Sequence, residues 1–233
     1  MQSSTWRALG NTYVVVQAAP TVRLDEAAVR ELAGATDGVL EVLATSESRV
    51  EIVIWNPDGS QAELSGNGTR IAAAWLAERT GAREVDVVVA GRVVSAALGE
   101  DGVVEQQLGT VVVGEIDTAA GIEFTPVSVG NPHAVVIGDP DDIRVIGPRL
   151  ERHPRFPERT NVQVARVDAP GVVTARVWER GVGETASSGT SAVAVAAATH
   201  GDGDVVVRFP GGDVRVRLAG GRATLYGTAE RVG

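Results

Sequence analysis

Short valine-rich runs of alternating or continuous apolar residues recur along the chain and are separated by Gly, Asp and Pro turns. Such runs are typical of β-strands. The predicted strands are residues 12–17, 38–44, 49–55, 84–90, 110–116, 133–138, 160–167, 172–178, 204–209, 213–218 and 222–227. Three stretches have a helical pattern, residues 24–34, 68–81 and 190–201, and each ends near a glycine suited to a C-cap. The pattern predicts a mixed α/β protein with a majority of strands.

The predicted helix at 190–201 is apolar on every side. A helix without a polar face has to be surrounded by protein. We therefore expect a central helix wrapped by a curved sheet.

An internal repeat connects two parts of the chain. Trp55 stands ten residues before Ser65, and Trp178 stands ten residues before Ser188. In both places a glycine-bearing loop, a serine, a glycine and an alanine-rich helix follow in the same order, which indicates two related halves. We expect halves at 1–118 and 119–222, pseudo-symmetric, with a final strand at 223–233 that can return to the first half.

The two serines lie where a loop enters a helix. A helix N-terminus has unpaired backbone N–H groups and the positive end of the dipole, so it can hold an anion. Two such junctions facing across a cleft could grip one carboxylate and place Ser65 and Ser188 on opposite sides of its α-carbon. This arrangement fits a two-base racemase or epimerase. The alternative is that either serine only caps its helix, since serine is a preferred N-cap residue.

Composition narrows the function classes. The 233 residues carry a net charge of −9 without a basic block, which argues against nucleic-acid binding. The chain has no cysteine and no lysine, so thiol chemistry and a Schiff base are excluded, and three scattered histidines make a zinc site improbable. We expect no cofactor. No apolar run reaches the roughly 20 residues of a membrane span, and we expect a cytoplasmic protein. Neither serine lies in a Gly-x-Ser-x-Gly elbow, which argues against a serine hydrolase.

Six motifs in order resemble the diaminopimelate epimerase family over nearly the whole chain. They are "LGNTYVVV" at Leu9, "NPDGSQAELSGNGTR" at Asn56, "VSVGNPHAVV" at Val127, "RTNVQVARV" at Arg159, "VWERGVGETASSGTSA" at Val177, and "FPGGDVRVRL" with "LYGTAERVG" near the end. The resemblance implies an α/β fold of two pseudo-symmetric halves, each a curved, mostly antiparallel sheet wrapped around a central helix, with an active site in the cleft between them. It also implies cofactor-independent interconversion of LL- and meso-diaminopimelate in lysine and cell-wall precursor biosynthesis, and a homodimer.

The resemblance also assigns roles to residues. It places the catalytic pair at Ser65 and Ser188, where the family has cysteines, with His133 and Glu179 as partners that move protons to and from them. The implied substrate-binding positions are Asn11, Asn56, Gly66, Asn67, Asn131, Asn161, Arg180, Gly189 and Thr190. Arg can fork a carboxylate, and Asn offers both a donor and an acceptor.

Several positions depart from the family pattern. Besides the two serines, Thr12 replaces an acidic residue, Gly38 replaces an expected substrate-facing glutamine, and Ser191 stands where a glycine or small residue is usual. A hydroxyl near the pKa of water, about 15.7, is a far poorer base than a thiol near about 8.5. Three interpretations stay open: an epimerase disabled by serine at both positions, a related isomerase or dehydratase with another amino or hydroxy acid, and a non-catalytic amino-acid-binding protein.

Overall fold

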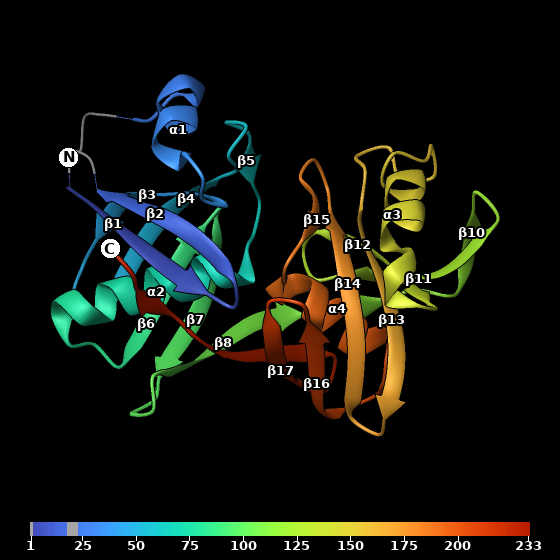
Figure 1. The fold of residues 1–233 in the computed structure, drawn as a ribbon. Helices are drawn as coiled ribbons and strands as arrows, with labels where there is room; N and C mark the ends of the chain where they lie inside the picture. Colours follow the sequence, from blue (N-terminus) through green and yellow to red (C-terminus); the bar gives the residue numbers. More distant parts are fainter. Residues whose placement is uncertain (1, 18–22) are drawn as a thin grey trace. The chain divides into compact units, whose positions relative to one another are not determined.

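The computed structural model describes residues 2–17 and 23–233 as a mixed α/β fold with many strands and few helices (Figure 1). The chain divides into two compact units, residues 1–107 with 226–233, and residues 108–225. These boundaries differ from 118/119 and 222/223, and the division into two functional halves stays a prediction.

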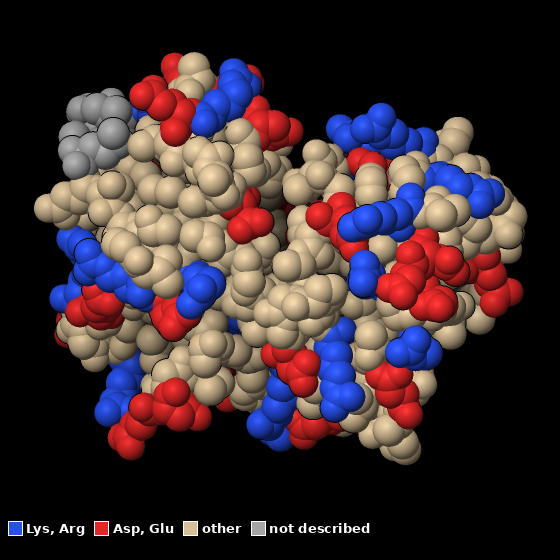
Figure 2. Space-filling model, in the orientation of Figure 1, with Lys and Arg blue, Asp and Glu red and all other residues tan. Residues whose placement is uncertain are grey.

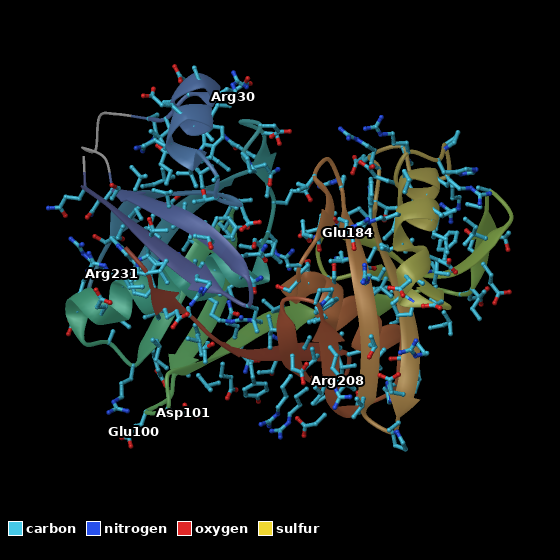
Figure 3. All side chains as sticks on the ribbon, viewed as in Figure 1. Arg30, Glu100, Asp101, Glu184, Arg208 and Arg231 are labelled. Atoms are coloured by element: carbon cyan, nitrogen blue, oxygen red, sulfur yellow. The ribbon has the colours of Figure 1, made fainter. Side chains whose placement is uncertain are left out.

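The described residues of the first unit form one long and one short helix. Its elements are β1 (Gln2–Ala8), β2 (Asn11–Gln17), α1 (Glu26–Ala33), β3 (Gly38–Thr45), β4 (Arg49–Trp55), β5 (Gln61–Ala62), α2 (Gly66–Thr80), β6 (Glu84–Val89), β7 (Arg92–Leu98), most of β8 (Val103–Thr110), the end of β18 (Arg222–Thr228) and β19 (Glu230–Arg231). The C-terminal strand β19 pairs with β1, and Arg231 Nη1 donates to Glu78 Oε1 of α2 at 3.1 Å (Figure 3).

The second unit repeats this order of strands and helices. Its elements are the end of β8, β9 (Val112–Val113), β10 (Asp117–Ala119), β11 (Ile122–Ser128), β12 (Pro132–Ile137), the 3₁₀ turn η1 (Pro140–Asp142), α3 (Ile143–Glu151), β13 (Asn161–Ala169), β14 (Val172–Glu179), β15 (Gly183–Thr185), α4 (Gly189–Thr199), β16 (Gly203–Phe209), β17 (Gly212–Ala219) and most of β18.

Strand pairing within each unit follows one scheme. In the first unit β1–β2 is antiparallel, β2–β3 parallel, β3–β4 antiparallel, β4–β6 parallel and β6–β7 antiparallel. In the second unit β11–β12, β12–β13, β13–β14, β14–β16 and β16–β17 alternate in the same way. Even the register shift recurs, between Val42 and Ala44 in one unit and between Val167 and Ala169 in the other. The repeat seen in the sequence is therefore a repeat of topology.

The second helix of each unit is its central helix. α2 contacts β1, β4, β6 and β7, while α4 contacts β11, β12, β13, β16 and β17. Residues 189–196 of α4 are all buried, as the absence of a polar face predicted. Valine and isoleucine side chains on the inner faces of the strands cover both helices, and each fully buried side chain of this kind stabilises the fold by about 1.5–3 kcal/mol.

The indole N–H of each repeated tryptophan donates a hydrogen bond to a carboxylate. Trp55 Nε1 donates to Glu41 Oε2, and Trp178 Nε1 donates to Glu151 Oε2, both at 3.0 Å. Glu41 comes from a strand, β3, whereas Glu151 comes from the end of a helix, α3. The tryptophan–glutamate hydrogen bond is thus present in both units, but the glutamate comes from a different element in each.

Some predicted elements were wrong in detail. Residues 110–116 do not form one strand, because β8 ends at Thr110 and β9 covers only Val112–Val113. Helix α4 is not capped by Gly201, since its C-cap is His200 in an extended conformation. Gly81 does cap α2 in the left-handed conformation, with φ 77°.

Charged side chains are interspersed by sign over the face seen in Figure 2. Local ion pairs account for part of this pattern. Arg217 bonds Asp204, and Glu184 accepts from Arg144 Nε at 2.6 Å and from Arg176 Nη1 at 3.0 Å. The Glu184 pairs fix the short strand β15, which leads into the loop before Ser188 (Figure 3).

Candidate active site

Ser65 is the N-cap of α2 in the first unit. Its backbone is extended, and its Oγ accepts a hydrogen bond from Gly68 N at 3.0 Å. The hydroxyl of Tyr13 lies 3.4 Å from the same Oγ. The capping role considered from the sequence is therefore real for Ser65, and one further polar group faces its hydroxyl.

Ser188 is the N-cap of α4 in the second unit, but its side chain makes no capping hydrogen bond. The residue is 8% exposed, and its carbonyl accepts from Ala192 N at 2.9 Å. Helix capping thus explains the backbone position of Ser188 but does not explain why this position carries a hydroxyl.

An asparagine from a glycine–asparagine turn meets each helix start. Asn67 Nδ2 donates to Asn11 Oδ1 at 2.6 Å in the first unit. In the second unit Asn131 Nδ2 donates to Thr190 Oγ1 at 3.4 Å. Asn11 and Asn131 correspond in the repeat, because Gly10 and Gly130 precede them with positive φ and each introduces the strand that begins the parallel pair. The structure therefore brings together candidate substrate-binding residues within each unit.

His133 is held as a neutral imidazole inside the second unit. It is 1% exposed, with Nε2 2.9 Å from Asn131 Oδ1 and Nδ1 3.0 Å from Gln163 Nε2. Because an amide oxygen only accepts, Nε2 carries the proton and Nδ1 accepts from Gln163. Burial lowers the pKa of His133 to about 3, against the hydrogen bond from Gln163, and the charge of Arg180 lowers it further. His133 is therefore a neutral imidazole at neutral pH in this structure, with its single N–H proton on Nε2.

Glu179 and Arg180 lie at the end of β14 and in the turn that follows. Glu179 Oε1 accepts from Thr185 Oγ1 at 2.6 Å. The backbone N–H of Arg180 donates to Asn161 Oδ1 at 3.0 Å, and its Nη1 donates to the carbonyl of Glu158 at 3.1 Å. Asn161 in turn donates from Nδ2 to the carbonyl of Pro132 at 3.0 Å. The amide of Asn161 thus fixes the turn that carries the guanidinium.

Asn56 closes the loop that precedes Ser65. Its backbone N–H donates to Ser60 O at 2.8 Å, and its Nδ2 donates to Ser60 Oγ at 2.9 Å. Gly66 and Gly189, the first helical residues after the serines, are buried at the helix starts. Asn56 therefore serves turn geometry in this structure, while the backbone of the two glycines forms the helix ends.

Sequence reasoning missed several residues of these clusters. Tyr13 occupies the position in "GNTYVVV" that His133 occupies in "GNPHAVV", so alignment of the two halves could have found it. The same alignment pairs Leu40 with Gln163 and Gly68 with Ser191. Gln163 Nε2 lies 2.9 Å from Ser191 Oγ, which links β13 to the first turn of α4.

Gly38 occupies a backbone position that excludes a side chain. Its φ is 155°, and a Cβ there would lie far inside van der Waals contact with the carbonyl oxygen of Trp55 and 2.9 Å from Tyr13 Cε1. The glutamine that the family resemblance suggested cannot be accommodated on this backbone. The pairing of β3 with β4 thus leaves no room for a glutamine side chain at position 38.

We expect Gly38→Gln to destabilise the protein by roughly 2–4 kcal/mol, because the side chain must displace the β4 backbone or the Tyr13 ring. Urea unfolding measures the change. Gly34→Gln is the matched control, since Gly34 also has a positive φ, 53°, but a Cβ there meets nothing within 4 Å. Equal loss of stability in both variants would show that backbone conformation alone, and not the contact with β4, decides the cost.

Two further absences bear on the kind of site. Within residues 2–17 and 23–233, no helix combines the length and apolar composition needed to cross a bilayer. In the same described part of the chain, no cluster of three or more His, Cys, Asp or Glu side chains has the arrangement of a metal site.

Solved structures with this fold include epimerases and racemases. A protein described as a predicted epimerase from Pseudomonas aeruginosa matches with a TM-score of 0.75 at 17% identity, covering 99% of this chain and 96% of its own. A hydroxyproline epimerase from Agrobacterium vitis matches with a TM-score of 0.71 at 16% identity, covering 100% and 91%. At these identities the likeness establishes the fold alone, an α/β fold that epimerases and racemases share.

Sequence relatives define the family within this fold. The diaminopimelate epimerase family model matches residues 6–114 and 125–231. The diaminopimelate epimerase of Desulforudis audaxviator is 34% identical, with 100% of this chain and 97% of the relative covered. Diaminopimelate epimerase 2 of Nostoc sp. is 32% identical, with 94% and 88% covered. The chain belongs to the diaminopimelate epimerase family.

Proposed function

We propose that this isomerase-family chain binds diaminopimelate and uses positions 65 and 188 on opposite faces of the substrate's α-carbon. The observation that carries the proposal is the repeated junction: Ser65 and Ser188 are both N-caps of the buried central helices of units with the same topology. Family membership at 34% identity over the whole chain supports the substrate.

The helix starts supply the proposed cradle for the α-carboxylate. Backbone N–H groups at Gly66 and Asn67, and at Gly189 and Thr190, point out of the first turns, where the dipole favours a negative charge. In this proposal Arg180 holds the distal carboxylate as a bidentate donor. The remaining substrate-binding positions are the asparagine side chains at Asn11, Asn56, Asn131 and Asn161.

The proposed reaction moves two protons and needs no other reactant. The group at one junction removes the α-proton, the electron pair left on carbon is delocalised into the carboxylate held by the helix ends, and the group at the other junction donates a proton to the opposite face. His133 and Glu179 would restore the protonation states of the two groups. Since His133 is buried and neutral here, this role requires its bond to Asn131 to open.

Serine at both positions makes this reaction slow. The pKa of an ordinary hydroxyl is about 7 units above that of a thiol, so the deprotonated base is rare at neutral pH unless a neighbour activates it. We therefore propose that the chain keeps the binding site of the family and has weak or no turnover. A relative acting on another amino or hydroxy acid is the second candidate, favoured by Thr12 and by the closed backbone at Gly38.

Titration of the protein with meso- and LL-diaminopimelate by calorimetry tests the binding proposal. We expect a Kd within about 1 μM–1 mM, the range common for enzyme substrates. Arg180→Met should weaken binding at least about tenfold, because a charged hydrogen bond to the distal carboxylate is lost. Arg222→Met, a change at an exposed arginine outside the candidate site, is the matched control. Failure of diaminopimelate to bind, together with binding of proline, hydroxyproline or a hydroxy acid, would replace the proposed substrate.

We also propose that the protein works in the cytoplasm as a homodimer. The location rests on the sequence, in which no apolar run reaches the length of a membrane span, and the homodimer rests on the family resemblance. Sedimentation equilibrium of the purified chain tests the second, since a monomer at micromolar concentration would contradict it.

A further inference from the structure

Arg70 is a buried arginine that the proposed reaction does not use. It lies on α2, five residues after Ser65, and is 0% exposed. Among the residues that the structure describes, no acidic side chain forms an ion pair with it, and its Nη2 has no hydrogen-bond partner. Burial lowers the pKa of Arg70 to about 10, which leaves the guanidinium charged at neutral pH. A buried charge without a counter-ion is costly, so its presence calls for a reason.

The fold leaves space for this guanidinium. Gly227 of β18 packs directly on it, and a Cβ at that glycine would lie 2.6 Å from Arg70 Nη1. On the other side Arg70 Nε donates to Gln106 Oε1 of β8 at 3.1 Å. The side chain is therefore confined by the sheet and cannot turn outward to solvent.

Two hydrogen-bond chains lead from Arg70 back to the start of α2. In the first, Arg70 Nη1 donates to Asn67 Oδ1 at 3.3 Å, and Asn67 Nδ2 donates to Asn11 Oδ1 at 2.6 Å. Because a guanidinium only donates, Asn67 has to turn its amide oxygen toward Arg70. The Asn67 amide nitrogen then faces Asn11 and donates to its Oδ1.

The second chain ends at the serine itself. Gln106 accepts from Arg70 Nε, and its Nε2 donates to Thr69 Oγ1 at 2.8 Å. Thr69 Oγ1 then donates to the carbonyl of Ser65 at 2.8 Å. Both hydrogen-bond chains therefore connect the buried Arg70 guanidinium to the start of α2, where the proposed base is located at position 65.

The second unit lacks such a cation. The residue five positions after Ser188 is Val193, which is 0% exposed. The two junctions have the same topology but different electrostatic surroundings.

We propose that Arg70 is an electrostatic positioning residue that favours an anionic group at position 65 and orients the amides of Asn67 and Asn11. The proposal rests on the proposed function only in taking position 65 as the site of a reacting group. The positive charge of the Arg70 guanidinium acts through a buried region of low dielectric constant, where two charges interact much more strongly than in water.

Other ionisable side chains also act on this position. The hydroxyl of Tyr13 lies 3.4 Å from Ser65 Oγ, and Glu63 stands two residues before Ser65. Glu41 of β3 is buried but is bound to Trp55 and to the Leu24 backbone. The remaining charged residues of the elements packed on α2 are partly or fully exposed and are screened by solvent; they are Arg7, Arg49, Glu51, Glu84, Asp86, Arg92, Glu230 and Arg231.

A single introduced thiol measures the effect directly, because the chain contains no cysteine. In Ser65→Cys, the pH dependence of alkylation by iodoacetamide gives the pKa of the thiol. We expect Arg70→Met in this background to raise that pKa by about 0.5–1 unit, as loss of one charge through a partly shielded path predicts. Arg70→Lys keeps the charge and should retain more than half of the lowering.

The matched control is Ser188→Cys, whose thiol should shift by less than half as much when Arg70→Met is added. Circular dichroism establishes folding, and Arg70→Gln serves as the neutral variant if Arg70→Met does not fold. An unchanged thiol pKa at position 65, or equal shifts in the Met and Lys variants, would overturn the proposal. The measurement needs no substrate, so it can fail or succeed independently of diaminopimelate binding.

Discussion

Ser65→Cys combined with Ser188→Cys should start or sharply raise exchange of the α-proton of diaminopimelate with solvent deuterium, by about 10²–10⁴-fold, the usual contribution of general acid–base catalysis. The helix starts, Asn67 and Thr190 would still hold the α-carboxylate, and Arg180 would still hold the distal one. Only the acidity of the two reacting groups would change. Proton NMR in deuterated water follows the loss of the α-proton signal, and chiral chromatography follows stereoinversion.

The single variants separate a two-base reaction from a one-base reaction. Either single thiol should give at most partial washout of the α-proton without inversion, since the opposite face lacks a competent acid. Ser65→Ala with Ser188→Ala sets the background rate. Inversion by one single variant at the rate of the double variant would contradict the assignment of two opposed groups.

Glu151→Ala should lower the free energy of unfolding by about 2–4 kcal/mol, because buried hydrogen-bond donors are left without their acceptor. The Glu151 carboxylate is 3% exposed and accepts from Trp178 Nε1 at 3.0 Å, Gly181 N at 2.9 Å and Arg159 Nη1 at 3.3 Å. Without it, three donors around the Arg180 turn lose their acceptor. Urea unfolding at pH 7 measures the change, and Asp213→Asn, at an exposed pair with Arg208, should change stability by no more than about 1 kcal/mol.

The stabilisation of the fold by the Glu151 carboxylate should depend on pH. Burial raises the pKa of the Glu151 carboxyl, but hydrogen bonds from Trp178 and Gly181, with Arg152 and Arg159 nearby, outweigh burial and hold the pKa below its usual value of 4.5. A depressed carboxyl pKa stabilises the fold above the unfolded-state pKa, and this stabilisation is lost as pH falls through the folded-state pKa. The stability gap between the native protein and Glu151→Gln should therefore shrink below about pH 4.5. A gap that grows in acid would contradict this account.

The central helices were predicted, and so were the strands whose apolar periodicity agrees with their burial. The strands β1, β7, β8 and β11, each of seven or eight residues, were not predicted. Nor was helix α3, although it is nine residues long. It contains Gly147 and Pro148, which normally argue against a helix interior. The structure supplies the reason for the glycine: a Cβ at position 147 would lie 2.6 Å from Trp178 Cγ, so the helix can cross the indole only at a glycine. Tertiary packing, which local sequence does not encode, overrides propensity there.

In the candidate site, too, some residues follow from local sequence and others depend on partners that are distant in sequence. Ser65 and Ser188 follow from the repeat and from the junction chemistry, because loop, serine and helix are contiguous in sequence. Arg70 and Gln163 do not, since their importance comes from partners on distant strands, Gln106 for the first and His133 for the second. Ser188 also differs from Ser65 in making no cap bond, a difference that two identical N-cap signals in the sequence cannot express.

A crystal structure of the serine protein with bound diaminopimelate tests the two-base arrangement most directly, through the distance between Ser65 Oγ and Ser188 Oγ. Because one α-carbon has to fit between the two groups, we expect that distance to be about 5–8 Å, with the α-carboxylate at the starts of α2 and α4. Hydroxyls more than about 15 Å apart in the liganded protein, with the α-carbon in reach of only one of them, would contradict the account.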